Sequence, residues 1–139
     1  MLNIAIVENE KEQSEQLRQY AERYAYEHGG RCRVTQYENG LDFISEYKGG
    51  FDAVFMDIKM PLMDGMEAAE KLRKVDQDVS LIFVTNMAQL AIRGYKVSAK
   101  AFIVKPVAYF DFALELDKIR KEVERRGVSG LWVNAGGAM

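Results

Sequence analysis

The stretch VFMDIKMPLMDGMEAAEKLR, residues 54–73, decides the fold class of this chain. It begins with three apolar residues, as a buried strand does, and this strand ends on a carboxylate, Asp57. Asp64 and Glu67 then stand at the spacing of a capping box, and apolar residues follow at helical intervals. The stretch therefore predicts a strand, a loop and a helix in succession, which is the repeating unit of an α/β fold.

The same alternation of strand and helix continues along the chain. Apolar runs predict strands over residues 2–7, 31–37, 53–56, 81–84 and 101–104. Helical spacing predicts helices over residues 10–26, 88–94 and 108–125, and two more that begin after Asn39 and at Asp64. Five strands and five helices in strict alternation predict an α/β fold, in which a doubly wound parallel sheet carries helices on both faces.

The composition is that of one ordinary domain. The chain has 139 residues, of which 48% are hydrophobic and 29% charged, so it can bury a core of its own. The net charge of −2 argues against direct contact of this domain with nucleic acid, and no apolar run approaches the roughly 20 residues that a membrane span needs. The single cysteine, Cys32, cannot form an internal disulfide, and the N-terminus does not resemble a signal peptide, so we expect a cytoplasmic protein.

Polar side chains gather where the predicted strands end. In an open parallel sheet, ligands bind at the carboxyl ends of the strands. The residues at these ends are Glu8 and Asn9, Asp57, Thr85 and Asn86, and Lys105 followed by Pro106. The sequence therefore predicts one edge of the sheet that combines carboxylates, amides, a hydroxyl and an amine, and Asp57 belongs to this edge rather than to the core.

These groups suit phosphoryl chemistry on a carboxylate. Clustered oxygen ligands favour a hard cation such as Mg²⁺, and a carboxylate such as Asp57 can act as a nucleophile that forms an aspartyl-phosphate. Lys105 adds a positive charge that can stabilise a transferring phosphoryl group, and the Thr85 hydroxyl can donate to one of its oxygens. We expect Pro106 to fix the loop after Lys105, and a cis peptide bond is one way to do so.

The residues at the strand ends resemble the motifs of a known family, the receiver domains of two-component response regulators. The matching segments are VENE at 7–10, FMDIKMPLMDG at 55–65, FVTN at 83–86 and FIVKP at 102–106, in order along roughly residues 2–125. The resemblance implies a flavodoxin-like (βα)5 fold with strand order 2-1-3-4-5 and a receiver domain over residues 1–125. It also implies a signalling module rather than an enzyme.

The resemblance further implies a role for each matching residue. Asp57 is the expected phosphoacceptor for a cognate sensor histidine kinase. The expected Mg²⁺ ligands are Glu8, Asn9, Asp57 and the backbone carbonyl of Lys59. The groups expected to hold the phosphoryl group are the Thr85 hydroxyl, the Lys105 ammonium and the backbone amide of Asn86. Phe102 is expected to turn inward as Thr85 moves, which shifts the surface of the fourth helix, fifth strand and fifth helix. That surface would pair with another receiver in a homodimer or release an output domain.

A finer similarity concerns the output. The segments TNMAQLAIRGY at 85–95 and FIVKPV at 102–107, with YFDF at 109–112, resemble receivers of the LytTR subfamily, which carry a mostly β DNA-binding domain. In the tail, residues 126–139, we expect a linker and the start of a truncated domain of that type, with Leu131-Trp132-Val133 as its first strand. DNA contact and transcriptional control would then belong to the output domain, and the receiver itself would contact neither nucleic acid nor a membrane.

One position departs from the family pattern. The family usually has two acidic residues where this chain has Glu8 and Asn9, so we expect weaker Mg²⁺ binding. An alternative interpretation is a degenerate receiver that binds proteins independently of phosphate, although Asp57, Thr85 and Lys105 are all retained. A hydrolase of the aspartyl-phosphate type fits less well, because its nucleophile usually follows the first strand. A flavodoxin-like carrier would need a glycine-rich phosphate loop in place of the acidic residues 7–11.

Overall fold

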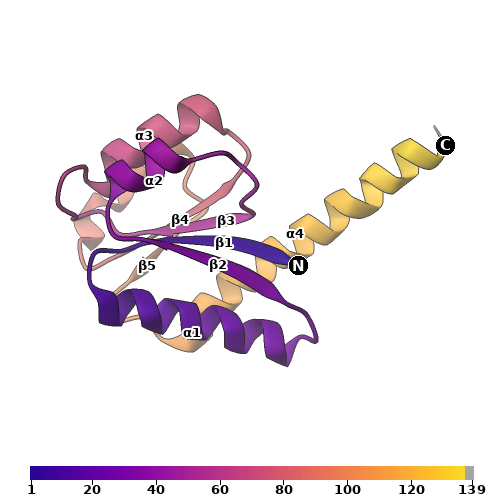
Figure 1. Cartoon of the computed structure of the whole chain (residues 1–139), viewed down its shortest axis with the longest axis horizontal. Coiled ribbons are helices and arrows are strands. Elements are labelled where there is room, and N and C mark those ends of the chain that lie inside the picture. Colours follow the sequence, from indigo (N-terminus) through magenta and orange to yellow (C-terminus); the bar gives the residue numbers. More distant parts are fainter. Residues whose placement is uncertain (137–139) are drawn as a thin grey trace.

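Five parallel strands form the centre of the molecule, and helices cover both faces of the sheet (Figure 1). The computed structural model describes the backbone of residues 1–136 and the side chains of residues 1–126 apart from Ala88. The strands are β1 (Leu2–Val7), β2 (Cys32–Tyr37), β3 (Ala53–Met56), β4 (Ser80–Thr85) and β5 (Ala101–Val104). The helices are α1 (Lys11–Glu27), α2 (Gly40–Glu46), α3 (Gly65–Val75), the 3₁₀ helix η1 (Ala88–Val97) and α4 (Tyr109–Gly136).

The strand order is β2-β1-β3-β4-β5, and all neighbouring strands are parallel. β3 and β4 are completely buried and β1 nearly so, which explains their apolar runs. β2 and β5 lie at the two edges of the sheet, and their residues differ more in exposure to solvent. The register pairs Val7 with Met56, Met56 with Phe83, and Thr85 with Val104, so the residues after these strands lie along one edge. The predicted flavodoxin-like (βα)5 fold is therefore confirmed.

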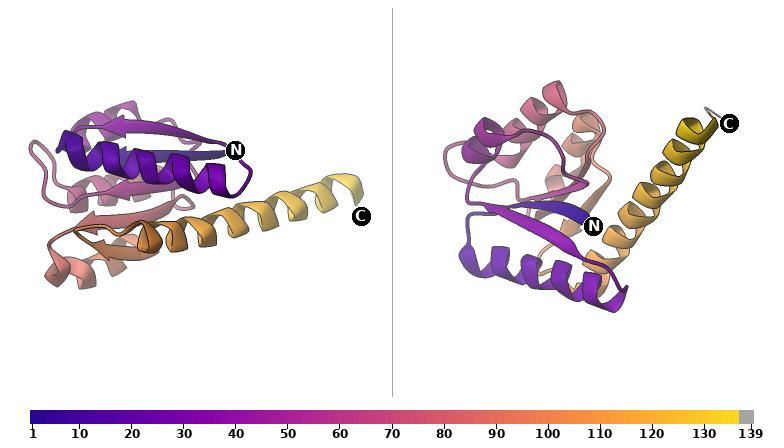
Figure 2. Two further views of the ribbon diagram at one scale, coloured as in Figure 1. Left: turned by 90° about the horizontal axis from the view of Figure 1, so that it is seen from below. Right: turned by 45° about the vertical axis from the view of Figure 1, so that its right-hand side comes forward.

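Two hydrophobic clusters lie on opposite faces of the sheet. On one face, α2, α3 and η1 pack apolar side chains that include Phe43, Leu72 and Val97. Helices α1 and α4 cover the other face (Figures 1 and 2). They contribute Leu17 and Phe112 to the second cluster. Burial of each large apolar side chain stabilises the fold by about 1.5–3 kcal/mol, so the two clusters hold the strand ends in a fixed frame.

Two helices begin at side chains that the sequence identified as caps. Asn39 Oδ1 accepts a hydrogen bond from the Asp42 amide at 2.8 Å, and Asp64 Oδ1 accepts one from the Glu67 amide at 2.8 Å. Such a cap typically stabilises a helix by about 1 kcal/mol. The second cap matters for the site, because it starts α3 directly after the loop that follows Asp57.

The structure corrects two expectations about helices. The segment predicted as a helix over 88–94 is a 3₁₀ helix, and it extends to Val97. The predicted strand Leu131-Trp132-Val133 is wrong, because α4 continues past the predicted end at Arg125 and reaches Gly136 (Figure 2). A strand satisfies its backbone groups only beside another strand, and none of the described strands lies along this segment, whereas a helix satisfies them internally. Although α4 has 28 residues, neither it nor any other helix in the described part of the chain is long and apolar enough to cross a membrane.

Candidate functional site

Three charged side chains from three strands meet at the carboxyl edge of the sheet. Glu8 directly follows β1, Asp57 directly follows β3, and Lys105 directly follows β5. The Lys105 ammonium donates to Glu8 Oε1 at 2.7 Å and to Asp57 Oδ2 at 2.8 Å. The structure therefore brings together the three charged residues that the sequence predicted at this edge, and a single lysine bridges the two carboxylates.

This triad of Glu8, Asp57 and Lys105 is largely shielded from solvent, because the three side chains retain only 2%, 8% and 11% of their accessible surface. Burial raises the pKa of Glu8 above its ordinary value of 4.5, and hydrogen bonds from Lys105 and from the Glu10 amide offset only part of that effect. Burial also opposes the charge on Lys105, but its hydrogen bonds to Asp57 and Glu8 outweigh burial and raise its pKa. Two carboxylates and one ammonium leave a surplus negative charge, which favours a further cation.

The loop after β3 fixes the backbone around Asp57. Asp57 Oδ1 accepts a hydrogen bond from the Ile58 amide at 2.7 Å, and the Gly65 amide donates to the Ile58 carbonyl at 2.6 Å. A Cβ atom at Gly65 would lie 2.0 Å from the Asp57 carbonyl oxygen, so a larger residue would force the backbone apart. Glycine at this position therefore lets the start of α3 close against the residue that carries the carboxylate.

Thr85 ends β4, which lies between the strands that lead to Asp57 and Lys105. Its side chain is completely buried, and Thr85 Oγ1 accepts a hydrogen bond from the Met87 amide at 3.2 Å. The Thr85 carbonyl accepts from the Lys105 amide at 3.0 Å, which ties the ends of β4 and β5 together. Asn86, the next residue, is exposed at the same edge.

The segment around β5 carries the two remaining predicted residues. The ring of Phe102 is half-buried, and its centroid lies 5.7 Å from that of Phe83. The Lys105–Pro106 peptide bond is cis, as the sequence suggested. A pocket of about 330 Å³ opens beside Lys105 and Pro106, and its other walls include Gln13 of α1 and Asn86. The carboxyl edge is thus accessible from the α1 side of the sheet.

The expected Mg²⁺ ligands form a set of hard oxygen donors. Asn9 directly follows the buried Glu8, and Lys59 lies two positions after Asp57. Both residues are exposed. Among the residues that the structure describes, no three acidic, histidine or cysteine side chains converge as a metal site. Two carboxylates, an amide oxygen and a backbone carbonyl still suit Mg²⁺, because this ion keeps several waters and needs only one or two carboxylates. The Lys105 ammonium between the carboxylates marks the place where positive charge is favoured.

Comparison with known families agrees with this geometry. The model of the response regulator receiver domain matches residues 4–116, a range that contains the whole triad. This chain belongs to the response regulator receiver family. The receiver identified here therefore shares its family with signalling modules of two-component systems, as the motifs at the strand ends indicated.

Individual relatives of this receiver include the sensory transduction protein LytT of Oceanobacillus iheyensis, 30% identical over 96 residues. That match covers 66% of this chain but 38% of LytT, so the receiver spans well under half the length of this relative. Among solved structures, the response regulatory domain of mrkE from Klebsiella pneumoniae has a TM-score of 0.77 at 23% identity, with 89% of this chain and 99% of that one covered. The response regulator TrrA of Thermotoga maritima, in complex with Mg²⁺-BeF, has a TM-score of 0.68 at 24% identity, with 86% and 99% covered. These two structures share the fold of the receiver.

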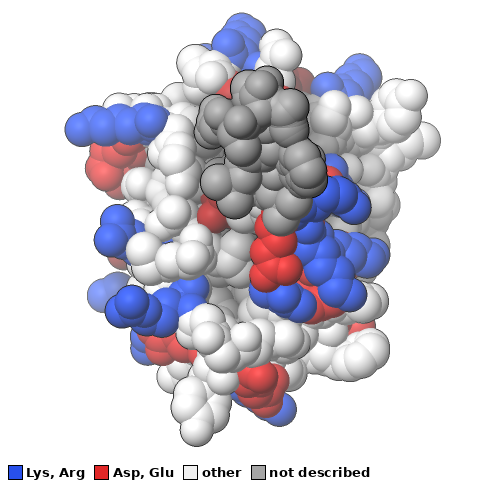
Figure 3. Space-filling model, turned by 90° about the vertical axis from the view of Figure 1, so that its right-hand side faces the viewer, with Lys and Arg blue, Asp and Glu red and all other residues white. Residues whose placement is uncertain are grey.

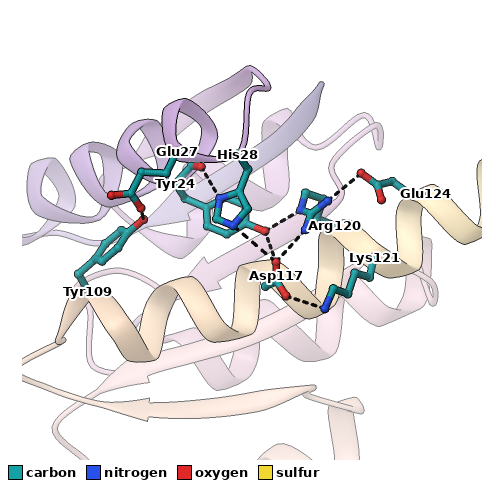
Figure 4. A network of polar contacts seen from close by, with 8 residues as sticks. All are labelled: Tyr24, Glu27, His28, Tyr109, Asp117, Arg120, Lys121 and Glu124. Carbon is teal, nitrogen blue, oxygen red and sulfur yellow. Dashed lines mark hydrogen bonds and ion pairs between the residues drawn. The ribbon is translucent and has the colours of Figure 1, made fainter.

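A second polar cluster, where α1 contacts α4, was not found from the sequence (Figure 4). The Tyr24 hydroxyl donates to Asp117 Oδ1 at 2.7 Å and accepts from Arg120 Nε at 2.7 Å. Arg120 also donates to Asp117 at 2.9 Å, and Lys121 lies 3.1 Å from the other carboxylate oxygen. The hydrogen bond from Tyr24, with those from Arg120 and Lys121, holds the pKa of Asp117 well below its ordinary value of 3.8. Tyr24 stands at helical spacing with Leu17 and Ala21, a pattern that indicates a core face and no polar contact, and its acidic partner lies 93 residues away along the receiver chain.

Proposed function

We propose that this receiver accepts a phosphoryl group on Asp57 from a sensor histidine kinase, with Mg²⁺ bound at the carboxyl edge. The observation that carries the proposal is the bridge of Lys105 between the buried carboxylates of Glu8 and Asp57. An ammonium held beside a buried carboxylate suits the charge that develops on a transferring phosphoryl group. After transfer, a phosphoryl oxygen replaces Asp57 Oδ2 as the acceptor of Lys105.

In the proposed reaction, one carboxylate oxygen of Asp57 attacks the phosphorus of a phosphohistidine. The oxygen–phosphorus bond forms as the bond from phosphorus to the imidazole nitrogen breaks, and the nitrogen keeps the electron pair. Bound Mg²⁺ supplies positive charge that offsets the phosphoryl oxygens, and the groups that hold it are Glu8, Asn9, Asp57 and the Lys59 carbonyl. Asp57 Oδ1 accepts a hydrogen bond from the Ile58 amide, and Oδ2 accepts one from Lys105. The oxygen that attacks therefore loses its hydrogen bond to one of these donors.

The phosphoryl group gains two further partners in this proposal. The Thr85 hydroxyl turns away from the Met87 amide and donates to a phosphoryl oxygen, and the Asn86 amide donates to another. Movement of the Thr85 side chain leaves space that the half-buried ring of Phe102 fills. These local changes alter the packing under η1 and β5, and a phosphoryl group shifts the equilibrium by its different free energy of interaction with the two states.

The responding surface is formed by η1, β5 and the first turns of α4. It carries large apolar side chains that are exposed to solvent, and these are Ile92, Tyr95, Val104, Phe110 and Leu114. Exposed apolar side chains that gather on neighbouring elements are typical of a protein contact surface. This surface therefore pairs with a second receiver or holds an output domain according to the state of Asp57.

The output is a DNA-binding domain of the LytTR type that controls transcription in the cytoplasm. The similarity to LytT supports this step, since the receiver matches only 38% of that relative's length. Residues 126–139 contain the linker toward this domain. The receiver itself contacts neither DNA nor a membrane, and it acts as a signalling module rather than as an enzyme.

The test is the intact mass of the chain after incubation with acetyl phosphate and Mg²⁺. Wild type is expected to gain one phosphoryl group that hydroxylamine removes, because an acyl phosphate is labile to that nucleophile. Asp57→Asn is expected to gain none, while Asp111→Asn, which changes an exposed aspartate of α4, serves as the matched control and gains one. Uptake that persists in Asp57→Asn would contradict the assignment of this residue.

A second candidate function is a degenerate receiver that binds a partner independently of phosphate. The observation that favours it is Asn9, an exposed amide at the position where the family usually has a second acidic residue. If wild type gains no phosphoryl group even at high Mg²⁺ concentration, this second function replaces the first.

A further inference from the structure

Lys105 stands on a short segment at one edge of the sheet. β5 pairs with β4 on one side, and no other strand in the described part of the chain lies along its other side. The Lys105 amide donates to the Thr85 carbonyl at 3.0 Å, but Pro106 has no amide hydrogen to donate. The pocket of about 330 Å³ also opens between this segment and the first half of α1. Pairing with β4 therefore holds the backbone at Lys105, and a different contact is needed to hold the residues that follow.

A tyrosine of α1 supplies such a contact. The Tyr20 hydroxyl donates to the Val107 carbonyl at 2.9 Å, a bond that joins residues 87 positions apart. The Val107 side chain is buried in the same hydrophobic cluster against which the Tyr20 ring packs. A side chain of α1 thus holds the backbone two residues after Lys105.

The ring of Tyr20 is itself held in place by two rings of α4. Its centroid lies 5.4 Å from that of Tyr109, with the two planes at 69°. It lies 5.8 Å from the centroid of Phe112, which is completely buried. Aromatic pairs favour such edge-to-face and tilted arrangements. A tyrosine side chain has two χ angles, so contacts that restrict both of them also fix the position of the hydroxyl.

The start of α4 is attached to α1 by a second set of contacts. The Tyr109 hydroxyl donates to Glu27 Oε1 at 2.6 Å (Figure 4). The guanidinium carbon of Arg23 lies 3.8 Å from the centroid of the Tyr109 ring, and a cation over an aromatic face at this distance is attracted to it. Val107 and Tyr109 are thus both attached to α1, so α1 restrains the segment that follows Lys105.

The contacts of the Lys105 ammonium depend on the position of this segment. The ammonium lies 2.7 Å from Glu8 Oε1 and 2.8 Å from Asp57 Oδ2 at the same time. These oxygens belong to residues that follow two different strands. A lysine side chain is flexible, but simultaneous contact with both oxygens leaves it little freedom. A backbone shift of about 1 Å would take one of the two contacts beyond the range of a good hydrogen bond.

We propose that Tyr20 is a positioning residue for phosphoryl transfer to Asp57. Its hydroxyl fixes the Val107 carbonyl, and the segment fixed in this way holds the Lys105 ammonium where a phosphoryl oxygen accepts from it during transfer. Tyr20 acts through Lys105 rather than on the reacting atoms. This inference rests on the phosphorylation of Asp57 proposed above.

The NMR signal of the Lys105 ammonium in the ¹⁵N-labelled chain, recorded without phosphodonor, tests the resting contact. A buried, hydrogen-bonded ammonium exchanges its hydrogens slowly with water, and Lys105→Met identifies the signal by its absence. Tyr20→Phe removes one hydroxyl and keeps the ring. We expect exchange of the Lys105 ammonium to become roughly three- to ten-fold faster in this variant, as loss of one hydrogen bond would produce.

Tyr24→Phe is the matched control. It removes another tyrosine hydroxyl between α1 and α4, but that hydroxyl contacts Asp117 and Arg120 and not the segment after Lys105. We expect this control to lower the urea concentration at which the chain unfolds and to leave exchange of the Lys105 ammonium unchanged. Exchange in Tyr20→Phe that equals wild type would overturn the inference. Equal acceleration in the two variants would also overturn it, because Tyr20 would then act through the stability of the fold alone.

Phosphorylation by acetyl phosphate with Mg²⁺, followed by intact mass, tests the effect on the reaction. Tyr20→Phe is expected to lower the maximal rate roughly three- to ten-fold and Tyr24→Phe to leave it unchanged. The acetyl phosphate concentration that gives half of the maximal rate is expected to stay the same, because Lys105 stabilises charge that develops during transfer. If wild type is phosphorylated and Tyr20→Phe reacts at the same rate, the inference is wrong and the proposed function stands. If wild type gains no phosphoryl group, the proposed function fails and the role of Tyr20 in the reaction fails with it.

Discussion

Two clusters of charged side chains in this receiver have similar distances and different surroundings. In the triad, Lys105 lies 2.7 Å from Glu8 and 2.8 Å from Asp57. In the α1–α4 cluster of Tyr24, Asp117, Arg120 and Lys121, Arg120 lies 2.9 Å from Asp117, and both of these side chains retain 27% of their accessible surface. The triad retains at most 11%. Geometry alone therefore does not separate the two clusters, but burial does.

The balance of charge also differs. The triad has two carboxylates and one cation, so it keeps a surplus negative charge where water cannot screen it. In the α1–α4 cluster, Asp117 has two cationic neighbours, and Arg120 also contacts Glu124 at 3.0 Å. Basic and acidic side chains are likewise interspersed on the face of the molecule that is turned toward the viewer in Figure 3. The comparison teaches that the triad is suited to take up a cation, whereas the α1–α4 cluster is suited to hold two helices together.

Removal of the cation from each cluster is expected to give the largest difference between them. Lys105→Met leaves two buried carboxylates without a partner, and we expect it to lower the free energy of unfolding by about 3 kcal/mol in the absence of Mg²⁺. Arg120→Met is the matched substitution, and we expect a loss of about 1 kcal/mol because Lys121 and water still stabilise Asp117. Urea denaturation monitored by circular dichroism measures both.

Mg²⁺ sharpens this first prediction. The ion is expected to restore part of the stability of Lys105→Met, because it replaces the missing positive charge between Glu8 and Asp57. It is expected to leave Arg120→Met unchanged. Equal losses in the two variants, or equal recovery with Mg²⁺, would show that burial does not distinguish the clusters.

Addition of a carboxylate to the triad is expected to have the next largest effect. Asn9→Asp adds a second acidic side chain beside Glu8, and we expect Mg²⁺ affinity to rise roughly ten-fold because ligand charge strengthens binding of hard cations. Isothermal titration calorimetry measures the change. Asp57→Asn is the opposite control and is expected to weaken binding, while an affinity of Asn9→Asp equal to wild type would mean that residue 9 does not contact the ion.

The dependence of stability on pH is expected to have opposite signs in the two clusters. The pKa of Asp117 lies below its ordinary value of 3.8. Its contribution to the free energy of unfolding is therefore complete above that pH and is lost as the pH falls. The pKa of Glu8 lies above its ordinary value of 4.5, so its contribution to the free energy of unfolding is complete below that pH and is lost as the pH rises. Asp117→Asn should therefore cost about 1 kcal/mol at neutral pH, whereas Glu8→Gln should stabilise the metal-free chain there.

Urea denaturation at a series of pH values down to about pH 3 measures these slopes. For each variant, the difference from wild type is expected to shrink as the solution becomes more acidic, because Glu8 becomes neutral in the folded chain and Asp117 becomes neutral first in the unfolded chain. A destabilised Glu8→Gln at neutral pH without Mg²⁺ would contradict the conclusion that burial opposes the charge on Glu8.

Salt is expected to give the smallest effect. At 1 M NaCl the screening length falls to about 3 Å, so the partly exposed pairs of the α1–α4 cluster should weaken by a few tenths of a kcal/mol. The buried triad should respond less. Double-mutant cycles for Arg120 with Asp117 and for Lys105 with Glu8, each at low and high salt, compare the two, and a larger salt response in the triad would contradict its burial.

The sequence was sufficient for the fold and for the composition of the triad. Glu8, Asp57 and Lys105 each follow an apolar run, and parallel strands bring such positions to one edge of the sheet regardless of the intervening loops. Asn39 and Asp64 were also recognised as caps, because a cap depends on residues three positions apart and not on the rest of the fold.

Features that depend on distant contacts could not be predicted. The Tyr24 hydroxyl meets Asp117 only because α1 and α4 cover the same face of the sheet. Arg73 of α3 donates through Nε to the Val97 carbonyl at the end of η1, 24 residues away along the chain, and local spacing does not contain this contact. The strand predicted at Leu131-Trp132-Val133 failed for a related reason, because apolar residues indicate burial but do not specify a neighbouring strand. The choice between 3₁₀ and α-helix over 88–97 likewise depends on packing that local spacing does not contain.

The length of α4 turns a small change at the domain into a large one further along the chain. The side chain of Val123 in α4 packs against the core, and the helix continues beyond it to Gly136. At 1.5 Å per residue this extension is about 20 Å long, so a tilt of roughly 10° at its start displaces its end by about 3.5 Å. A tilt of α4 about its contacts with Tyr24 at Asp117 and Arg120 thus produces its largest displacement at the far end of the helix. A change at this cluster that is too small to alter the free energy of unfolding measurably would still displace the end of the helix.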